Sequence, residues 1–179
     1  MTRVPSAERR AEALLAQFAV RAAPVPVEHL ALRLGLTVER AQLGDDVSGI
    51  LVIRDGRGLI GVNAAQVPTR QRFSIAHEVG HFLLHPRAMQ VFIDKQFTRP
   101  YLAAFRDATS ATGEDRRERE ANAFAAALLM PETLVRDAVV RLALDVEDEA
   151  AVAQLAKRFE VSQQAMTFRL VNLLAGARG

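Results

Sequence analysis

The pentapeptide His-Glu-Val-Gly-His at residues 77–81 constrains this chain more than any other part of its sequence. On an α-helix, His77 and His81 lie one turn apart and project from one face, so both imidazoles can reach a single tetrahedral metal ion. Glu78 directly follows the first histidine and can act as a general base toward an attacking water. The pattern therefore predicts a zinc site of the kind that zinc peptidases use.

The sequence around the pentapeptide predicts a buried helix. From Pro68 onward, apolar residues recur at helical spacing and continue through the pentapeptide. Three of the four histidines, His77, His81 and His85, fall within nine residues. Burying imidazoles and a carboxylate without partners costs free energy, so a metal site is favoured over a chance pattern on a surface helix. His85 could be a further ligand, but a hydrogen bond near the helix end is the favoured interpretation.

Two histidines leave a catalytic zinc site incomplete, because such a site has three protein ligands and one open position. A third histidine at the HExxHxxGxxH spacing is excluded, since Leu84 and Arg87 stand where that pattern needs glycine and histidine. Residues 114–130 predict a second helix that ends before Pro131. Its first turns offer three candidate ligands: Glu114, Glu118 and Glu120.

Glu118 is the favoured third ligand. It opens the pattern E-x-x-A-N, which resembles the E-x-x-(A/S)-D of zinc peptidases with a glutamate ligand. In that pattern the last residue, here Asn122, can hydrogen-bond a ligand imidazole. Glu120 lies about 200° around the helix from Glu118, so both cannot face one metal ion.

The order of predicted elements favours an α+β fold, with strands early and helices late. Runs that end at Ile53 and Asn63 flank an Asp-Gly turn and predict a hairpin. The second run, 59–63, is also a candidate edge strand for pairing with an extended peptide. Residues 86–113 predict loops with one short helix after Pro100. Asp145 is the predicted N-cap of the next helix, and two helices at 147–159 and 163–175 end the chain.

Composition narrows the class of protein. A chain of 179 residues that is 50% apolar can form one well-packed core. A net charge of +2 argues against a surface that grips nucleic acid throughout. The absence of cysteine excludes disulfide and thiol chemistry. No apolar stretch has the length of a signal peptide or membrane span, so we expect a soluble, cytoplasmic protein without membrane contact.

Residues 155–174 have the outline of a helix-turn-helix, with Ser162 as the N-cap of the second helix. A DNA-binding role would need Gln163, Gln164 and Arg169 exposed. The second helix, however, carries an apolar stripe that must pack: Met166, Leu170, Leu173 and Leu174. Few basic residues lie along the pair, so packing or docking of a protein is favoured over direct DNA contact.

Three segments together resemble the ImmA/IrrE family of metallo-endopeptidases: RQRFSIAHEVGHFLLH (70–85), EREANAFAAALLMP (118–131) and LAKRFEVSQQAMTFRL (155–170). The resemblance extends over most of the chain. It implies a gluzincin-like core at 1–143, with a small sheet packed on helices, followed by a helix-turn-helix-like pair at 144–179.

The resemblance also implies the site and the function. His77, His81 and Glu118 would bind one zinc ion, with Mn²⁺ or another divalent ion as the alternative, and Glu78 would be the general base. The substrate would be a helix-turn-helix repressor, whose cleavage relieves repression of mobile-element, phage or stress-response genes.

Two other functions compete with this one. The first is a catalytically weak zinc-fold module, of a binding or toxin–antitoxin kind, that acts by binding a partner repressor. The second, a DNA-binding regulator with structural zinc, is disfavoured because structural sites have four protein ligands and no general base. Tyr101 and Arg72 are candidate donors to the oxyanion of the reaction, and the sequence does not choose between them.

Overall fold

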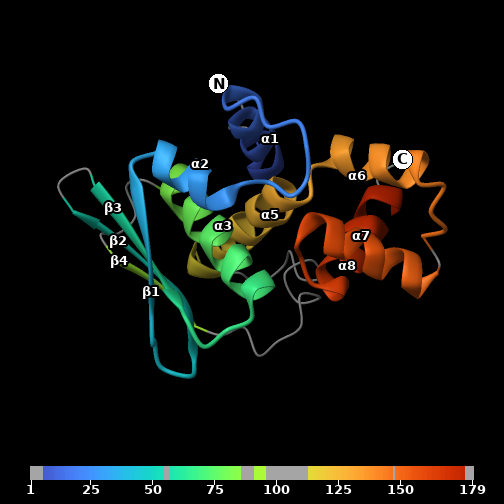
Figure 1. Ribbon diagram of the computed structural model, residues 1–179. Helices are drawn as coiled ribbons and strands as arrows, with labels where there is room; N and C mark the ends of the chain where they lie inside the picture. Colours follow the sequence, from blue (N-terminus) through green and yellow to red (C-terminus); the bar gives the residue numbers. More distant parts are fainter. Residues whose placement is uncertain (1–5, 55–56, 86–90, 96–112, 147, 176–179) are drawn as a thin grey trace.

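The computed structural model describes residues 6–54, 57–85, 91–95, 113–146 and 148–175. Its strands form a single four-stranded sheet, and the helices lie on one side of that sheet (Figure 1). The predicted α+β class is confirmed. Within the described residues, no helix is both long enough and apolar enough to cross a membrane.

The sheet has the strand order β1-β3-β2-β4. Its strands are β1 (Leu36–Ala41), β2 (Val47–Arg54), β3 (Arg57–Asn63) and β4 (Val91–Lys95). β1 pairs with β3 in parallel, and the other two pairs are antiparallel. The predicted hairpin is therefore confirmed as β2–β3.

Two predictions about the sheet are wrong. Residues 59–63 do not form an edge, because β3 pairs with β1 on one side and β2 on the other. The edge beyond β2 is β4, which lies in a segment predicted as loop. Five residues are too few to show a strand period, and pairing with a strand some forty residues earlier leaves no local signal. The short helix predicted after Pro100 falls outside the described residues.

Two short helices precede the sheet. In α1 (Ala7–Gln17), Ser6 caps the first turn by accepting the Arg9 N–H. α2 (Val27–Arg33) ends just before Gly35, whose φ of 82° lets the chain turn into β1. Both helices bury their apolar faces in the common core.

The helix that carries the pentapeptide is α3 (Pro68–Leu84), which begins with proline at a position where its missing N–H costs nothing. Every residue from Ser74 to His81 is buried, so the prediction of a central helix is confirmed. α3 lies between the sheet and α5 (Gly113–Leu129). This sandwiched position explains why its polar residues must find partners within the protein.

Three helices complete the described chain: α6 (Glu132–Arg141), α7 (Glu149–Phe159) and α8 (Gln163–Ala175). Asp148 caps α7 by accepting the Ala150 N–H at 3.0 Å, so the prediction of Asp145 as N-cap is wrong. Acidic residues recur from 145 to 149, and local preference does not choose among them. The Ser162 hydroxyl accepts the Ala165 N–H at 3.1 Å, as predicted.

The α7–α8 pair packs into the common apolar core through Leu155, Phe159 and Met166. The predicted apolar stripe of α8 is buried at Met166 and Leu170, but Leu174 is 47% exposed. Gln163 and Gln164 are exposed. Arg169, which a DNA-binding surface would have exposed, is buried.

Candidate metal centre

α3 and α5 approach each other closely at Gly80. A Cβ atom at this position would lie 3.2 Å from the Cα of Ala121 and 3.1 Å from a ring carbon of Phe124. Gly80 and Ala121, which are both small, therefore allow the helix backbones to come together. This close approach brings the first turns of α5 against the histidine face of α3. The sequence does not predict this role for Gly80, although a glycine in mid-helix, which lowers helix stability, is a signal for it.

Three side chains converge where the helices cross. The Nε2 atoms of His77 and His81 lie 2.9 Å apart. The two carboxylate oxygens of Glu118 lie 3.2 Å from Nε2 of His77 and 3.1 Å from Nε2 of His81. These two imidazoles and one carboxylate could hold a metal ion, because their candidate ligand atoms all lie within 4.8 Å of one another.

The protonation states of this cluster suit a cation. Burial lowers the pKa of His81, which favours the neutral imidazole with a free lone pair. Burial alone would raise the pKa of Glu118, but hydrogen bonds with His77 and His81 outweigh it, so this pKa lies well below its usual range. A neutral imidazole and an ionised carboxylate are the forms in which these groups bind metals.

Asn122 orients the first histidine. Its Oδ1 lies 2.9 Å from Nδ1 of His77, and the amide is almost fully buried. If His77 donates its Nδ1–H to this oxygen, Nε2 carries the lone pair and faces Glu118. The predicted contact between Asn122 and an imidazole is thus confirmed.

Glu120 and His85 lie outside the three-residue cluster. Glu120 accepts a hydrogen bond from Arg116 at 2.9 Å, and its other oxygen is 3.8 Å from Nε2 of His85. The same Nε2 is 3.3 Å from the Arg117 carbonyl, so His85 links the end of α3 to the start of α5. The side chain of Glu114 is outside the described part of the structure.

Glu78, which directly follows His77 in α3, is fully buried. A Cβ atom at Gly49 of β2 would lie 3.1 Å from its Oε1 and 3.4 Å from the Cβ of Ser74. The missing side chain of Gly49 therefore leaves the space that the Glu78 carboxylate occupies between α3 and the sheet. The sequence does not predict this contact, but a glycine inside a strand commonly marks such a close approach.

Arg72, one of the two candidate oxyanion donors, makes its polar contacts with groups outside the cluster. Arg72 donates a hydrogen bond to the Val25 carbonyl at 2.8 Å and pairs with Glu160 at 3.2 Å. These contacts join α3 to the segment before α2 and to the end of α7. Tyr101 lies outside the described residues.

Comparison with known proteins identifies the family. The family of the IrrE N-terminal-like domain matches residues 31–171. This chain belongs to that family. The radiation response metalloprotease IrrE of Deinococcus radiodurans is 34% identical over 123 residues, which make up 65% of this chain and 33% of that protein. The matched region thus spans about a third of this relative.

The fold is shared with a solved structure. A transcriptional regulator of Mycobacterium tuberculosis superposes with a TM-score of 0.59 over 92% of this chain and 46% of that one. The sequence identity is 20%, so this likeness concerns the fold alone.

Proposed function

We propose that this member of the IrrE-like family is a zinc-dependent endopeptidase with a gluzincin-like core. His77, His81 and Glu118 hold the zinc ion, and Glu78 is the general base. The convergence of the three ligand groups beside a buried glutamate carries the proposal. The relative named as a metalloprotease supports it. Two imidazoles and one carboxylate suit zinc, whereas Mn²⁺ favours oxygen ligands.

Different residues of the chain have different roles in the proposed peptide hydrolysis. A bound zinc ion would polarise the scissile carbonyl and acidify the attacking water. Glu78 takes the proton from this water and returns it to the amine that leaves. Gly49 provides the space for the Glu78 carboxylate, and Asn122 fixes the orientation of His77.

The substrate backbone pairs with an edge of the sheet in this proposal. Among the described strands, β4 lies at an edge of the sheet and contacts α3, so an extended peptide added to it would run past the helix that carries the pentapeptide. This arrangement supplies backbone hydrogen bonds that are independent of the substrate's sequence. Selectivity must then come from side-chain contacts elsewhere on the protein.

The substrate we propose is a cytoplasmic helix-turn-helix repressor, whose cleavage relieves repression of mobile-element, phage or stress-response genes. The radiation-response role in the relative's name supports a regulatory substrate. Direct DNA contact by the helix-turn-helix-like pair α7–α8 is less favoured, because Arg169 is buried.

The experiment compares the wild-type protein with Glu78→Gln, both loaded with zinc and incubated with the repressor encoded beside the gene. Fragments are identified by mass spectrometry, and bound zinc is measured in parallel. We expect the variant to retain zinc while its cleavage rate falls at least about a hundredfold. Equal cleavage by both proteins would contradict the mechanism. Binding of the repressor without cleavage by either protein would instead support the catalytically weak binding or toxin–antitoxin module.

A further inference from the structure

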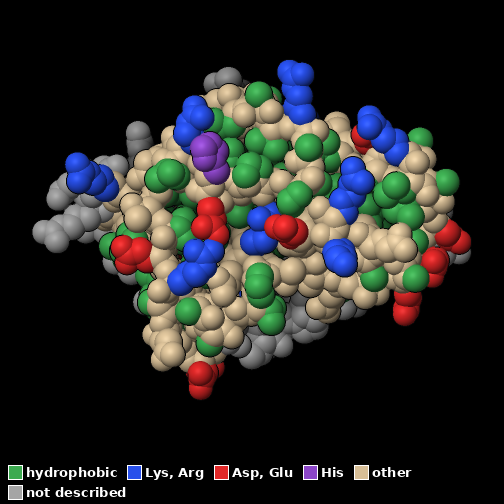
Figure 2. All heavy atoms as spheres, viewed as in Figure 1, with side chains coloured by type: hydrophobic (Ala, Val, Ile, Leu, Met, Phe, Trp, Pro, Cys, Tyr) green, Lys and Arg blue, Asp and Glu red, His purple; other side chains and the backbone are tan. Residues whose placement is uncertain are grey.

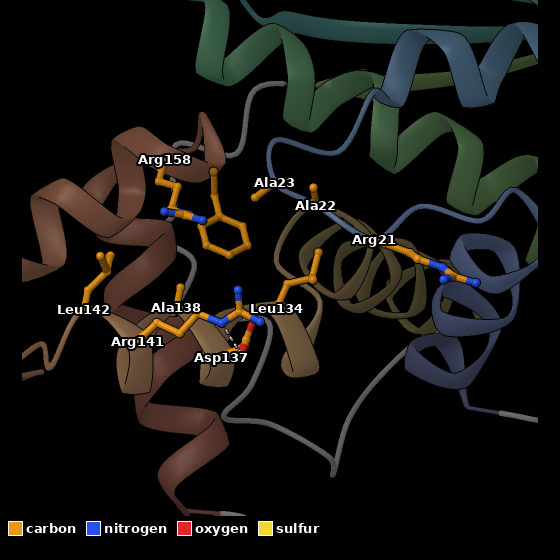
Figure 3. A pocket seen from close by; sticks show the side chains of 10 residues that line it. Arg21, Ala22, Ala23, Leu134, Asp137, Ala138, Arg141, Leu142 and Arg158 are labelled. Carbon is orange, nitrogen blue, oxygen red and sulfur yellow. Dashed lines mark hydrogen bonds and ion pairs between the residues drawn. The ribbon is translucent and has the colours of Figure 1, made fainter.

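A cavity of about 240 Å³ opens between α6, α7 and residues 21–23 (Figure 3). Its lining residues belong to neither α3 nor α5, so it is separate from the candidate metal centre. Ala23, Leu134 and the fully buried Phe159 form much of its apolar wall. Its volume is below the range typical of small-molecule sites and suits one or two side chains of a bound peptide.

The charged groups at the cavity are mainly cationic. Arg141 and Arg158 extend from α6 and α7 toward the same space, while Arg21 turns toward α1 (Figure 3). Arg141 pairs with Asp137 at 2.9 Å. Within the described part of the chain, no carboxylate forms an ion pair with Arg158, which is exposed. Within the described residues, the Arg158 guanidinium at the cavity therefore has no ion-pair partner, whereas Asp137, which also lines the cavity, pairs with Arg141.

Apolar side chains are exposed beside these arginines. Val140 is 78% exposed and Leu142 is 48% exposed at the end of α6, and Leu142 lines the cavity. Figure 2 shows green hydrophobic side chains among blue Lys and Arg side chains over α6 and α7. Exposed apolar groups next to an unpaired cation complement a ligand that combines an apolar group with a carboxylate.

We propose that this cavity docks a segment of the protein substrate in which an acidic side chain lies next to an apolar one. The inference rests on the proposed peptidase function. The carboxylate accepts hydrogen bonds from Arg158, in the paired geometry that guanidinium favours, and the apolar side chain packs against Leu142 and Leu134. Because no lining residue of the cavity belongs to the metal cluster or is Glu78, the cavity contributes to the affinity for substrate and leaves the chemical step unchanged.

The first experiment selects ligands from a random peptide library, using the full-length, zinc-loaded Glu78→Gln protein as bait. Each of two further baits carries a second substitution besides Glu78→Gln. That substitution is Arg158→Glu in one bait and Lys157→Glu in the other. Lys157 is the matched control, since it is exposed and adjacent on α7 but does not line the cavity. We expect peptides enriched in Asp or Glu beside Leu, Ile or Phe, and loss of this enrichment only with Arg158→Glu. Enrichment without acidic residues, or equal loss in both baits, would overturn the proposal.

The second experiment measures the affinity of one selected peptide by fluorescence anisotropy. Arg158→Glu should weaken binding at least about tenfold, because it removes a charge-assisted hydrogen bond and adds repulsion. Arg158→Gln, which removes the charge alone, should give a smaller loss, and Lys157→Glu should change the affinity less than about twofold. Unchanged affinity in Arg158→Glu, when its thermal unfolding matches that of Lys157→Glu, would also overturn the proposal.

Neither measurement requires cleavage, so the two proposals fail separately. If the repressor is not cut by the wild-type protein, the proposed function fails while the peptide selection still tests the cavity. If the repressor is cut, Arg158→Glu should raise KM at least about fivefold with kcat unchanged. A fall in kcat at constant KM would assign Arg158 to the reaction and overturn the docking role.

Discussion

The α3–α5 pair and the α7–α8 pair both consist of two packed helices, yet they bury different chemistry. Between α3 and α5 the buried or partly buried groups include His77, His81 and Glu118. The buried groups of α7 and α8 are mainly apolar, and Leu155, Phe159 and Met166 belong to the common core. Polar burial costs free energy unless partners satisfy it, whereas apolar burial stabilises directly. The α3–α5 pair, called the polar pair below, is therefore organised for chemistry. The α7–α8 pair, called the apolar pair, is organised for stability.

One buried charge connects the two pairs. Arg169 of α8 donates a hydrogen bond from Nε to the Met130 carbonyl at 3.0 Å, directly after the last residue of α5. Its guanidinium also lies 3.6 Å from Glu8 of α1. A cation near the C-terminal end of α5 complements the helix dipole. The apolar pair thus supports the helix that positions Glu118.

The largest expected effect comes from a cavity in the apolar pair. Leu155→Ala removes a side chain that is 1% exposed and should lower the free energy of unfolding by about 2–5 kcal/mol. Denaturant unfolding measures this loss, and zinc affinity is measured under conditions where the variant stays folded. Because α7 contributes no group to the metal cluster, the zinc affinity should remain that of wild type. A lower affinity in the folded variant would break the division of roles between the pairs.

The second prediction changes the polar pair. Glu118→Ala should weaken zinc binding by about a hundredfold or more, since loss of a ligand exceeds the ten- to hundredfold typical of groups that only orient ligands. Glu120→Ala is the matched control, two residues away, because its carboxylate contacts Arg116 and lies beside His85. Competition with a chromogenic chelator measures both affinities. If Glu120→Ala had the larger effect, the assignment of the third ligand would be reversed.

The sequence predicts the parts of the molecule that depend on local spacing. The helical period places His77 and His81 on one face, and the glutamate pattern distinguishes Glu118 from Glu120. An Asp-Gly turn between two apolar runs predicts β2–β3 in the same way. Each of these features is encoded within a few residues, so a periodic pattern is enough to find it.

Features that depend on distant contacts are not predicted. β4 joins the sheet beside β2 through residues that lie beyond α3, and the parallel pairing of β1 with β3 makes β3 internal. The roles of Gly49 and Gly80 depend on the side chain or backbone that faces each glycine across an interface. From the sequence alone, Arg169 is a candidate DNA-binding residue, and only the structure shows that it donates a hydrogen bond to the Met130 carbonyl instead. A pattern within one segment contains no information about these partners.

Gly80→Ala tests how closely the polar pair must approach. Helix propensity alone would favour alanine by about 1 kcal/mol. The new Cβ atom would lie 3.2 Å from the Ala121 Cα, however, and would push α5 and its Glu118 away from the histidines. We expect zinc affinity to fall about tenfold, within the range seen when the support of a ligand is lost. Gly44→Ala is the control, because nothing lies within 4 Å of a Cβ atom there; equal affinities in the two variants would contradict the close-approach argument.

The smallest expected effect is the pH dependence of the metal-free protein. Burial lowers the pKa of His81 and of His85, so below pH ~6.5 the unfolded chain binds protons before the folded protein does. The stabilisation from neutral histidines is present above that pH and is lost as the pH falls toward the folded-state pKa values, by at most about 1.4 kcal/mol per pH unit for each histidine. The pKa of Glu118 is also lowered, but its stabilisation is lost only below its ordinary value of 4.5, so histidines control the range above it.

This pH dependence belongs to one helix pair, since α7 and α8 contain no histidine. His85→Gln should reduce the slope of unfolding free energy against pH between about 6.5 and 5, because one titrating group is removed. Leu155→Ala should lower the whole curve and leave its slope unchanged, because no charge is altered. Urea denaturation at a series of pH values measures both curves. A slope that changes in Leu155→Ala but not in His85→Gln would show that the apolar pair, contrary to its composition, controls the response of the fold to acid.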